Sequence, residues 1–168
     1  MEAIPHRFFG YIAMQTKVSP GDILNTDPVL DNVIYHRQSA EYIVMVTKGR
    51  DIFEKVDTGS TITFEPGDST LTTILQDGEY RLKNSEYYEF WCISPYLNTD
   101  KIPLRNGLTP FKLMAGEEVQ ILKDSKLFLM EGVLNIGNSN YSGANRIQFT
   151  SGNKKVKALT NSYGLIVT

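Results

Sequence analysis

Two stretches of this chain repeat one another, and a tandem repeat constrains the fold more than any other feature of the sequence. The apolar runs Val44–Gly49 and Phe128–Gly132 both end in glycine, and these two glycines are 83 positions apart. Upstream, residues 17–21 match residues 112–116. Three later pairs keep an offset of 84 or 85 positions: Gly59 with Gly143, Phe64 with Phe149, and Gly67 with Gly152. A nearly constant offset indicates two copies of one structural unit.

Both copies consist of short segments in which apolar and polar residues alternate and β-branched and aromatic types prevail. Such alternation is typical of half-buried strands, and turn-forming residues separate the segments. We expect strands at 42–47, 51–56, 61–64, 70–75, 79–82, 88–93, 111–114, 119–122, 127–130, 133–136, 146–149, 156–159 and 165–167. No segment has convincing helical periodicity. The predicted fold class is therefore all-β, with two tandem jelly-roll or β-sandwich units and little or no helix.

The segment between the two copies differs from both in composition. Residues 95–108 contain prolines and few strand-forming runs, and we interpret them as a linker. An N-terminal arm with the first unit would then cover residues 1–94, and a second, smaller unit would cover residues 109–168. The apolar arm His6–Ile12 needs burial, and it can pair with its own sheet or with the sheet of a partner.

The order of these elements resembles the cupin superfamily. The run Leu127–Ile136 resembles the cupin strand pair in which a glycine ends the first conserved motif, and Phe64–Asp68 resembles the turn that opens the second motif. Two such units in one chain are similar to the two-domain bicupins. The resemblance implies a small jelly roll or barrel whose mouth often holds a metal, in a family in which dimers are common.

The metal ligands that the resemblance implies are incomplete in this chain. Metal-binding cupins usually supply three histidines and a glutamate, a set that suits manganese, iron, nickel or zinc. His36, Glu41 and Gly49 match the second histidine, the glutamate and the glycine of the first motif, with a spacing that differs by one residue. Ile34 stands in place of the first histidine, and the second copy contains no histidine. We therefore expect no metal and no cofactor.

Charge and cysteine usage argue against several classes of function. With 17 basic and 19 acidic residues the formal charge is -2, which offers no general attraction to nucleic acids or anionic membranes. The sequence shows no membrane-spanning run and no signal-peptide pattern, so the expected location is the cytoplasm, or a virion if the protein is viral. The single cysteine, Cys92, lies in an apolar strand and is interpreted as a small core residue, not a nucleophile.

The predicted strand around Cys92 carries aromatic residues on both faces. Alternation places Tyr88 and Phe90 on one side, and Tyr87, Glu89 and Trp91 on the other. A strand that is covered on both faces lies between two layers of one chain or between two chains. Core packing and a protein interface are therefore the main alternatives, with a carbohydrate site as a third.

The missing ligands, the apolar arm and the two-faced strand favour a non-catalytic structural or interaction module in a homo-oligomer. By analogy with small β-sandwiches that join large assemblies, we expect it in a virus or phage particle, with itself and other structural proteins as partners. The expected interface residues are Phe8, Phe9, Tyr11, Tyr88 and Phe90. Removal of residues 1–10 is expected to weaken self-association.

The alternative is a cupin that binds a small, sugar-type molecule, or a metal-independent isomerase or epimerase. Its site would be the mouth of the first unit, lined by His36, Glu41, Tyr80 and Trp91. His36 with Glu41 is the candidate acid–base pair, because such an enzyme needs a positioned proton donor or acceptor. The sequence leaves enzymatic activity open and favours its absence.

Overall fold

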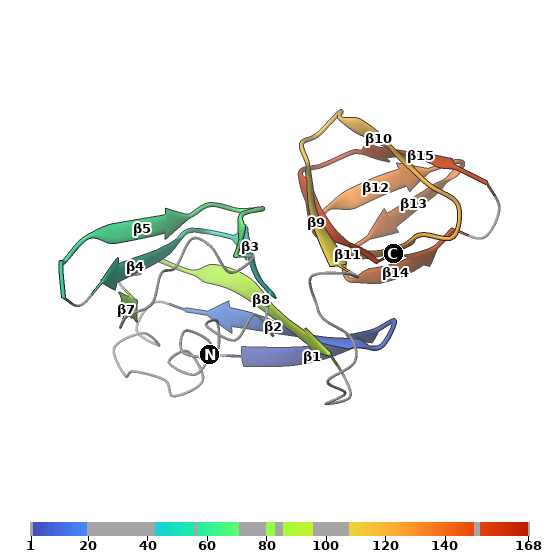
Figure 1. The fold of residues 1–168 in the computed structure, drawn as a ribbon. Coiled ribbons are helices and arrows are strands. Elements are labelled where there is room, and N and C mark those ends of the chain that lie inside the picture. The colour runs from blue at the N-terminus through green and yellow to red at the C-terminus, as the bar shows by residue number, and fades with distance from the viewer. Residues whose placement is uncertain are drawn as a thin grey trace. The chain divides into compact units, whose positions relative to one another are not determined.

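The computed structural model describes residues 2–19, 43–55, 57–70, 80–82, 86–95, 108–149 and 152–167. Every regular element in these ranges is a strand, which confirms the predicted all-β class (Figure 1). No helix in the described part of the chain is long and apolar enough to cross a membrane. The chain divides into two compact units, Met1–Leu104 and Arg105–Thr168. The boundary between them falls inside the expected linker 95–108, and the proposed domain limits stay a prediction.

The first unit is built on a five-stranded antiparallel sheet in the order β1-β2-β8-β3-β6 and a three-stranded sheet in the order β5-β4-β7. Apolar residues of both sheets share one core cluster: Val18, Val44, Val46, Phe64, Tyr88 and Phe90, with Ile62 and Cys92 packed against it. The strands are β1 (Glu2–Phe8), β2 (Tyr11–Val18), β3 (Ile43–Lys48), β4 (Asp51–Lys55), β5 (Thr61–Phe64), β6 (Ser69–Thr70), β7 (Tyr80–Leu82) and β8 (Tyr88–Pro95).

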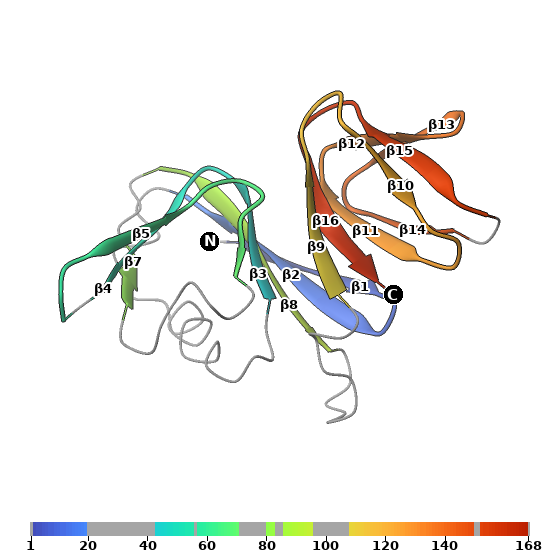
Figure 2. The ribbon, with the colours of Figure 1, turned by 45° about the horizontal axis from the view of Figure 1, so that its top comes forward.

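The second unit is a sandwich of two four-stranded antiparallel sheets, β14-β11-β16-β9 and β10-β15-β12-β13, which face each other (Figure 2). Nine buried residues from both sheets form its core: Leu113, Ile121, Leu127, Leu129, Leu134, Ile147, Phe149, Val156 and Ala158. The strands are β9 (Leu108–Leu113), β10 (Glu118–Ile121), β11 (Lys126–Glu131), β12 (Val133–Ile136), β13 (Ser139–Ser142), β14 (Asn145–Gln148), β15 (Lys154–Ala158) and β16 (Ser162–Val167).

The two units repeat one topology, as the sequence predicted. The order β2-β8-β3-β6 in the first unit corresponds to β9-β16-β11-β14 in the second, and β5-β4-β7 corresponds to β13-β12-β15. A register shift lies near the end of β3, between Val46 and Lys48, and another lies near the end of β11, between Leu129 and Glu131. A glycine follows each shift, at Gly49 and Gly132 (both at positive φ).

These two glycines are required where one strand approaches another closely. A Cβ atom at Gly49 would fall on the backbone oxygen of Tyr87, and one at Gly132 would fall on the backbone oxygen of Asn161. The structural equivalence of the two units therefore includes the strands that these glycines approach, β8 and β16. In this equivalence Tyr88 of β8 corresponds to Ser162 of β16. Only glycine tolerates both the contact and the left-handed backbone, which explains why this landmark was visible in the sequence.

Other pairs of the sequence repeat are shifted relative to the structure. Gly67 lies in the turn between β5 and β6, and its N–H donates to the carbonyl of Val46 at 2.8 Å. Its structural counterpart is Gly143, in the turn between β13 and β14, not Gly152. The pairing of Phe64 with Phe149 is wrong for the same reason. The β4–β5 connection, residues 56–60, is longer than the two-residue β12–β13 connection, so the offset changes inside the repeat.

The N-terminal arm belongs to the chain's own sheet. β1 and β2 form a hairpin through a two-residue turn at Phe9 and Gly10, and β2 then pairs with β8. Neither this hairpin nor β13 was among the predicted strands, because β2 contains alanine, methionine, glutamine and lysine, and β13 is largely polar. Where expected strands fall in the described ranges, the observed strands overlap them.

Candidate functional site

The residues expected to line a ligand site are only partly described. His36 and Glu41 lie outside the described residues, and for Tyr80 only its place in β7 is described. Trp91 lies in β8 and is fully buried. It faces away from the core cluster of the first unit, because Tyr88 and Phe90 of the same strand belong to that cluster. The four-residue ligand site stays a prediction.

The predicted division of β8 into two covered faces is confirmed. Tyr88 and Phe90 are buried inside the first unit, with ring centroids 5.8 Å apart. On the opposite face, Glu89 and Trp91 have no exposed surface, and Tyr87 shares that face through a hydrogen bond to Glu89. The assignment of these aromatic residues to an interface with another chain stays a prediction.

The expected interface residues of the hairpin also pack within the chain. The rings of Phe8 and Tyr11 stack with centroids 5.6 Å apart, and both residues are buried. Phe9 contacts Phe8 edge-on and is partly buried. Burial raises the pKa of the Tyr11 phenol, because the charged phenolate would lose solvation.

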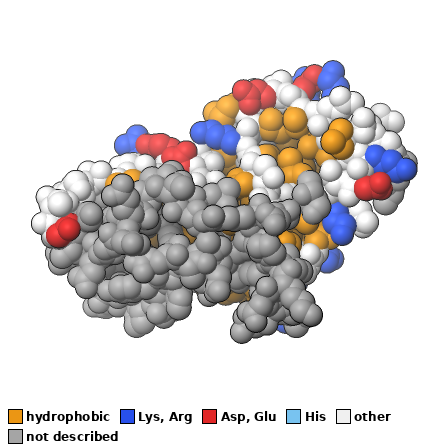
Figure 3. Space-filling view, viewed as in Figure 1, with side chains coloured by type: hydrophobic (Ala, Val, Ile, Leu, Met, Phe, Trp, Pro, Cys, Tyr) orange, Lys and Arg blue, Asp and Glu red, His pale blue; other side chains and the backbone are white. Residues whose placement is uncertain are grey.

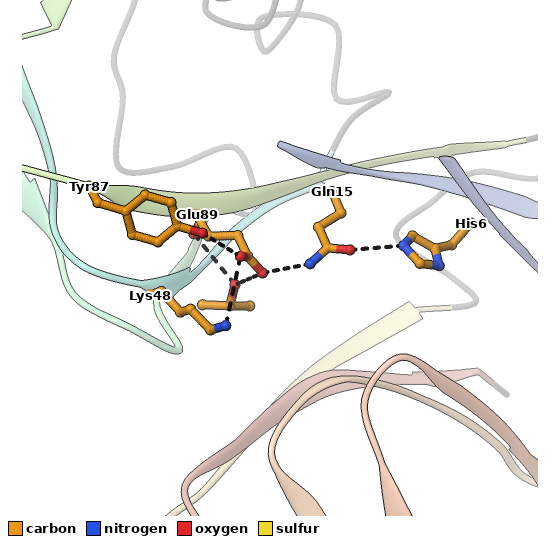
Figure 4. Close-up of polar contacts among 6 residues, drawn as sticks. His6, Gln15, Lys48, Tyr87 and Glu89 are labelled. Atoms are coloured by element: carbon orange, nitrogen blue, oxygen red, sulfur yellow. Dashed lines mark hydrogen bonds and ion pairs between the residues drawn. The ribbon is translucent and has the colours of Figure 1, made fainter. Parts of the chain in front are cut away.

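A buried carboxylate is the centre of the polar site that the structure reveals (Figure 4). Glu89 Oε1 accepts a hydrogen bond from Gln15 Nε2 at 2.8 Å and one from Thr47 Oγ1 at 3.4 Å. Glu89 Oε2 accepts one from the Tyr87 hydroxyl at 3.0 Å, and Lys48 Nζ lies 3.9 Å from the same oxygen. We call these five residues the Glu89 cluster.

This donor set determines what Glu89 can do. An ionised carboxylate only accepts hydrogen bonds, and its two oxygens offer about four lone-pair sites. Gln15, Thr47, Tyr87 and Lys48 occupy positions around both oxygens, and the carboxylate is buried. A carboxylate already surrounded by donors is poorly placed to take a proton from a substrate or to bind a metal ion. The geometry therefore fits a structural role better than a role as general base.

The cluster also reaches the N-terminal strand. Gln15 Oε1 lies 3.0 Å from His6 Nε2, so the glutamine amide bridges β1 and β8. The His6 ring packs against Trp91 with centroids 4.8 Å apart. Because Gln15 Nε2 donates to Glu89, its oxygen is left to accept, and His6 Nε2 then acts as the donor. This chain of contacts crosses three adjacent strands.

A row of alternating charge crosses the same sheet. Cα pairing places Glu2 opposite Lys17, Lys17 opposite Glu89, and Glu89 opposite Lys48. Opposite charges that face each other on neighbouring strands favour one register, and a slip of one residue would break every pair. The row and the hydrogen bonds of Gln15 therefore specify how β1 and β2 lie on β8.

The second unit has different residues at the equivalent positions. Lys112, Tyr163 and Glu131 occupy the places of Lys17, Glu89 and Lys48. Burial raises the pKa of Tyr163, and the negative charge of Glu131 adds to the effect, against a lowering hydrogen bond from Asn161. The buried acid is thus replaced by a phenol, and the Glu89 cluster is particular to the first unit.

Each described unit has an apolar core cluster, and a few polar side chains, Glu89 among them, are buried outside these clusters. In the described ranges, no group of three His, Cys, Asp or Glu side chains comes close enough to hold a metal ion. Cys92 is partly buried and packs against the first core, as the sequence analysis expected for a small core residue.

Local sequence patterns do not reveal the Glu89 cluster, although one signal is present. Glu89 is a charged residue inside an aromatic strand, between Tyr88 and Phe90, and a buried acid needs partners. Those partners are Gln15, on β2, and Lys48, on β3, which are distant in sequence. Only strand pairing brings them together.

Comparison with known proteins agrees with the tandem β architecture. No protein-family model and no curated protein sequence matches the chain. Among solved structures, AerE from Microcystis aeruginosa superposes with a TM-score of 0.50 at 12% identity, covering 99% of this chain and 91% of AerE. Ylba from E. coli has a TM-score of 0.49 at 9% identity, covering 98% and 81%. A cupin 2 conserved barrel domain protein from Leptotrichia buccalis has a TM-score of 0.39 at 8% identity, covering 99% and 88%.

At these identities the likeness concerns the fold alone. The chain has a cupin-type fold, with two jelly-roll units in tandem, as its motifs implied.

Proposed function

We propose that this chain is a non-catalytic interaction module that assembles into a homo-oligomer through its outer surfaces. The observation that carries the proposal is the exposure of large apolar side chains on the second unit, at Met114, Leu122 and Leu159. The Glu89 cluster supports the proposal, because its buried carboxylate accepts hydrogen bonds from Gln15 and Tyr87 and so joins neighbouring strands. The proposed setting, by analogy, is a multi-copy assembly such as a virus or phage particle.

The outer surface offers apolar side chains for such contacts. In the described ranges, Met114, Leu122 and Leu159 of the second unit are exposed to 40%, 64% and 43%. The turn that follows Met114 is hydrogen-bonded to the residue before Leu159, because Gly116 N–H donates to the carbonyl of Ala158. On the face seen in Figure 3, apolar side chains gather on the second unit and charged side chains surround them.

Solution mass tests this proposal. Light scattering should give the mass of two or more chains of 18.9 kDa each. The double variant Met114→Lys with Leu159→Lys should lower that mass, because buried cations oppose association. Arg50→Lys, an exposed change in the first unit that keeps its charge, is the matched control and should leave the mass unchanged. A wild-type mass of one chain at all concentrations would contradict the proposal.

The small-molecule alternative is tested with the same material. If sugar-type ligands raise the melting temperature of the wild type and not of His36→Ala, with folding unchanged, the binding function is favoured. An equal response of both proteins argues against His36 as a ligand-binding residue. Wild-type oligomer mass without any ligand response favours the interaction module.

A further inference from the structure

Among the described strands, one of the two edge strands of each main sheet carries a proline. Edge strand β1 of the first unit contains Pro5, and edge strand β9 of the second unit contains Pro110. Proline has no backbone N–H, so within a sheet it is found where its nitrogen faces away from the neighbouring strand. The nitrogens of Pro5 and Pro110 should therefore face away from the neighbouring described strands, β2 and β16.

Each proline lies at the middle one of the outward-facing backbone positions of its edge strand. In an antiparallel strand, every second residue directs its backbone N–H and C=O to the same side. Counted from the prolines, the outward positions of β1 are Ala3, Pro5 and Arg7, and those of β9 are Leu108, Pro110 and Lys112. Each edge thus lacks its middle donor and carries a cation two residues later. Proline and cationic side chains are both devices that oppose edge-to-edge pairing.

The duplication provides an internal comparison of the same edge. Gln15 of β2 lies opposite Trp91, and Pro110 of β9 lies opposite Leu165, at the equivalent place in the repeat. In the first unit this edge accepts an added strand, because Gln15 also pairs with Ile4 of β1. In the second unit the equivalent position is a proline, and β9 is the last strand of its sheet. The two units thus differ at the residue whose backbone N–H would donate to a strand added at this edge.

We propose that Pro5 and Pro110 seal these two sheet edges against strand addition by a second copy of this chain. In the first unit, β1 covers the edge of β2 and presents its own proline outward. In the second unit, proline blocks the edge directly. Homo-oligomers of the kind proposed above must then use surfaces other than these edges, so each of the two proposals can fail without the other.

Substitution of each proline by threonine restores the missing donor without adding a large apolar side chain. Pro5→Thr and Pro110→Thr should each raise the weight-average mass measured by light scattering as concentration increases. The first step should be a rise of about twofold over the wild type, because strand addition joins two particles. The double variant should continue to grow, since the missing donor is restored on two edge strands of each chain.

Ala3→Thr is the matched control, because it adds the same strand-forming side chain at an outward position that already has a donor. It should keep the wild-type mass. Wild-type mass for both proline variants, with unchanged circular dichroism, would overturn the proposal, and so would association of Ala3→Thr. If both proline variants fail to fold, the prolines serve folding and the proposal is also wrong. If one fails to fold, the other decides.

Discussion

Replacement of Glu89 by alanine removes the acceptor on which the Glu89 cluster converges. The variant loses two short hydrogen bonds to a carboxylate, from Gln15 at 2.8 Å and from Tyr87 at 3.0 Å. Tyr87 and Lys48 reach solvent, with exposed fractions of 41% and 48%, so they can pair with water. Gln15 is only partly exposed and Thr47 is buried, so their donors lose a partner in the protein.

The expected loss in the free energy of unfolding depends on how many of these donors can reach water. One hydrogen bond to a charged group contributes about 1.5–3 kcal/mol, and loss of one member of a buried ion pair costs about 3–5 kcal/mol. Because two of the four donors of Glu89 can turn to water, we expect Glu89→Ala to lower the free energy of unfolding by about 3 kcal/mol. Glu89→Gln keeps the shape and one acceptor oxygen, so its cost should be about half as large.

Urea unfolding followed by tryptophan fluorescence measures this loss. Trp91 is the single tryptophan of the chain and lies in the first unit, so it reports the unit that contains the cluster. Glu118→Ala is the control, because Glu118 is an exposed acid that pairs with Lys155 at 2.9 Å, and it should leave this transition unchanged. A change of less than about 0.5 kcal/mol for Glu89→Ala would refute the reasoning.

Two further predictions concern the second unit. Gly164→Ala should destabilise the second unit by about 2 kcal/mol or more, because an added Cβ would fall on the backbone oxygen of Phe128. Adding Phe111→Leu should not rescue this variant, because the backbone contact remains. Thermal melting followed by circular dichroism measures both variants, and a melting temperature of Gly164→Ala within error of the wild type would contradict the overlap. Because the pKa of Tyr163 is raised in the folded chain, the folded state holds that proton more tightly, and stability should fall as pH rises above about 10. Tyr163→Phe should lose less stability than the wild type between about pH 9 and pH 11 in chemical denaturation, and equal losses would count against the effect.

The sequence was sufficient for the fold class because the relevant signals are local. Alternation within Thr61–Phe64 and Val133–Ile136 predicted both strands at their observed limits, since one covered face repeats every second residue. Gly49 and Gly132 were visible as repeat landmarks because a backbone contact leaves no alternative residue. Length changes in hairpin connections have no such marker, and the later pairs of the repeat were consequently shifted.

The site was less accessible to sequence reasoning than the fold. The two faces of β8 follow from alternation, and the sequence placed Glu89 correctly beside Tyr87 and Trp91. Its partner Gln15 is 74 positions away, and no local pattern indicates that β2 pairs with β8. The role of Pro5 as an edge residue was equally hidden, because an edge is a property of strand order.

By itself, the sequence determined that this protein is a tandem of short-stranded β units with apolar cores, because side-chain periodicity and glycine placement act over a few residues. Only the tertiary structure decided that Glu89 is surrounded by donors, that β1 extends the chain's own sheet, and that Pro5 and Pro110 lie on edge strands. These features depend on which distant strands become neighbours, and that choice is made by the burial of the whole core.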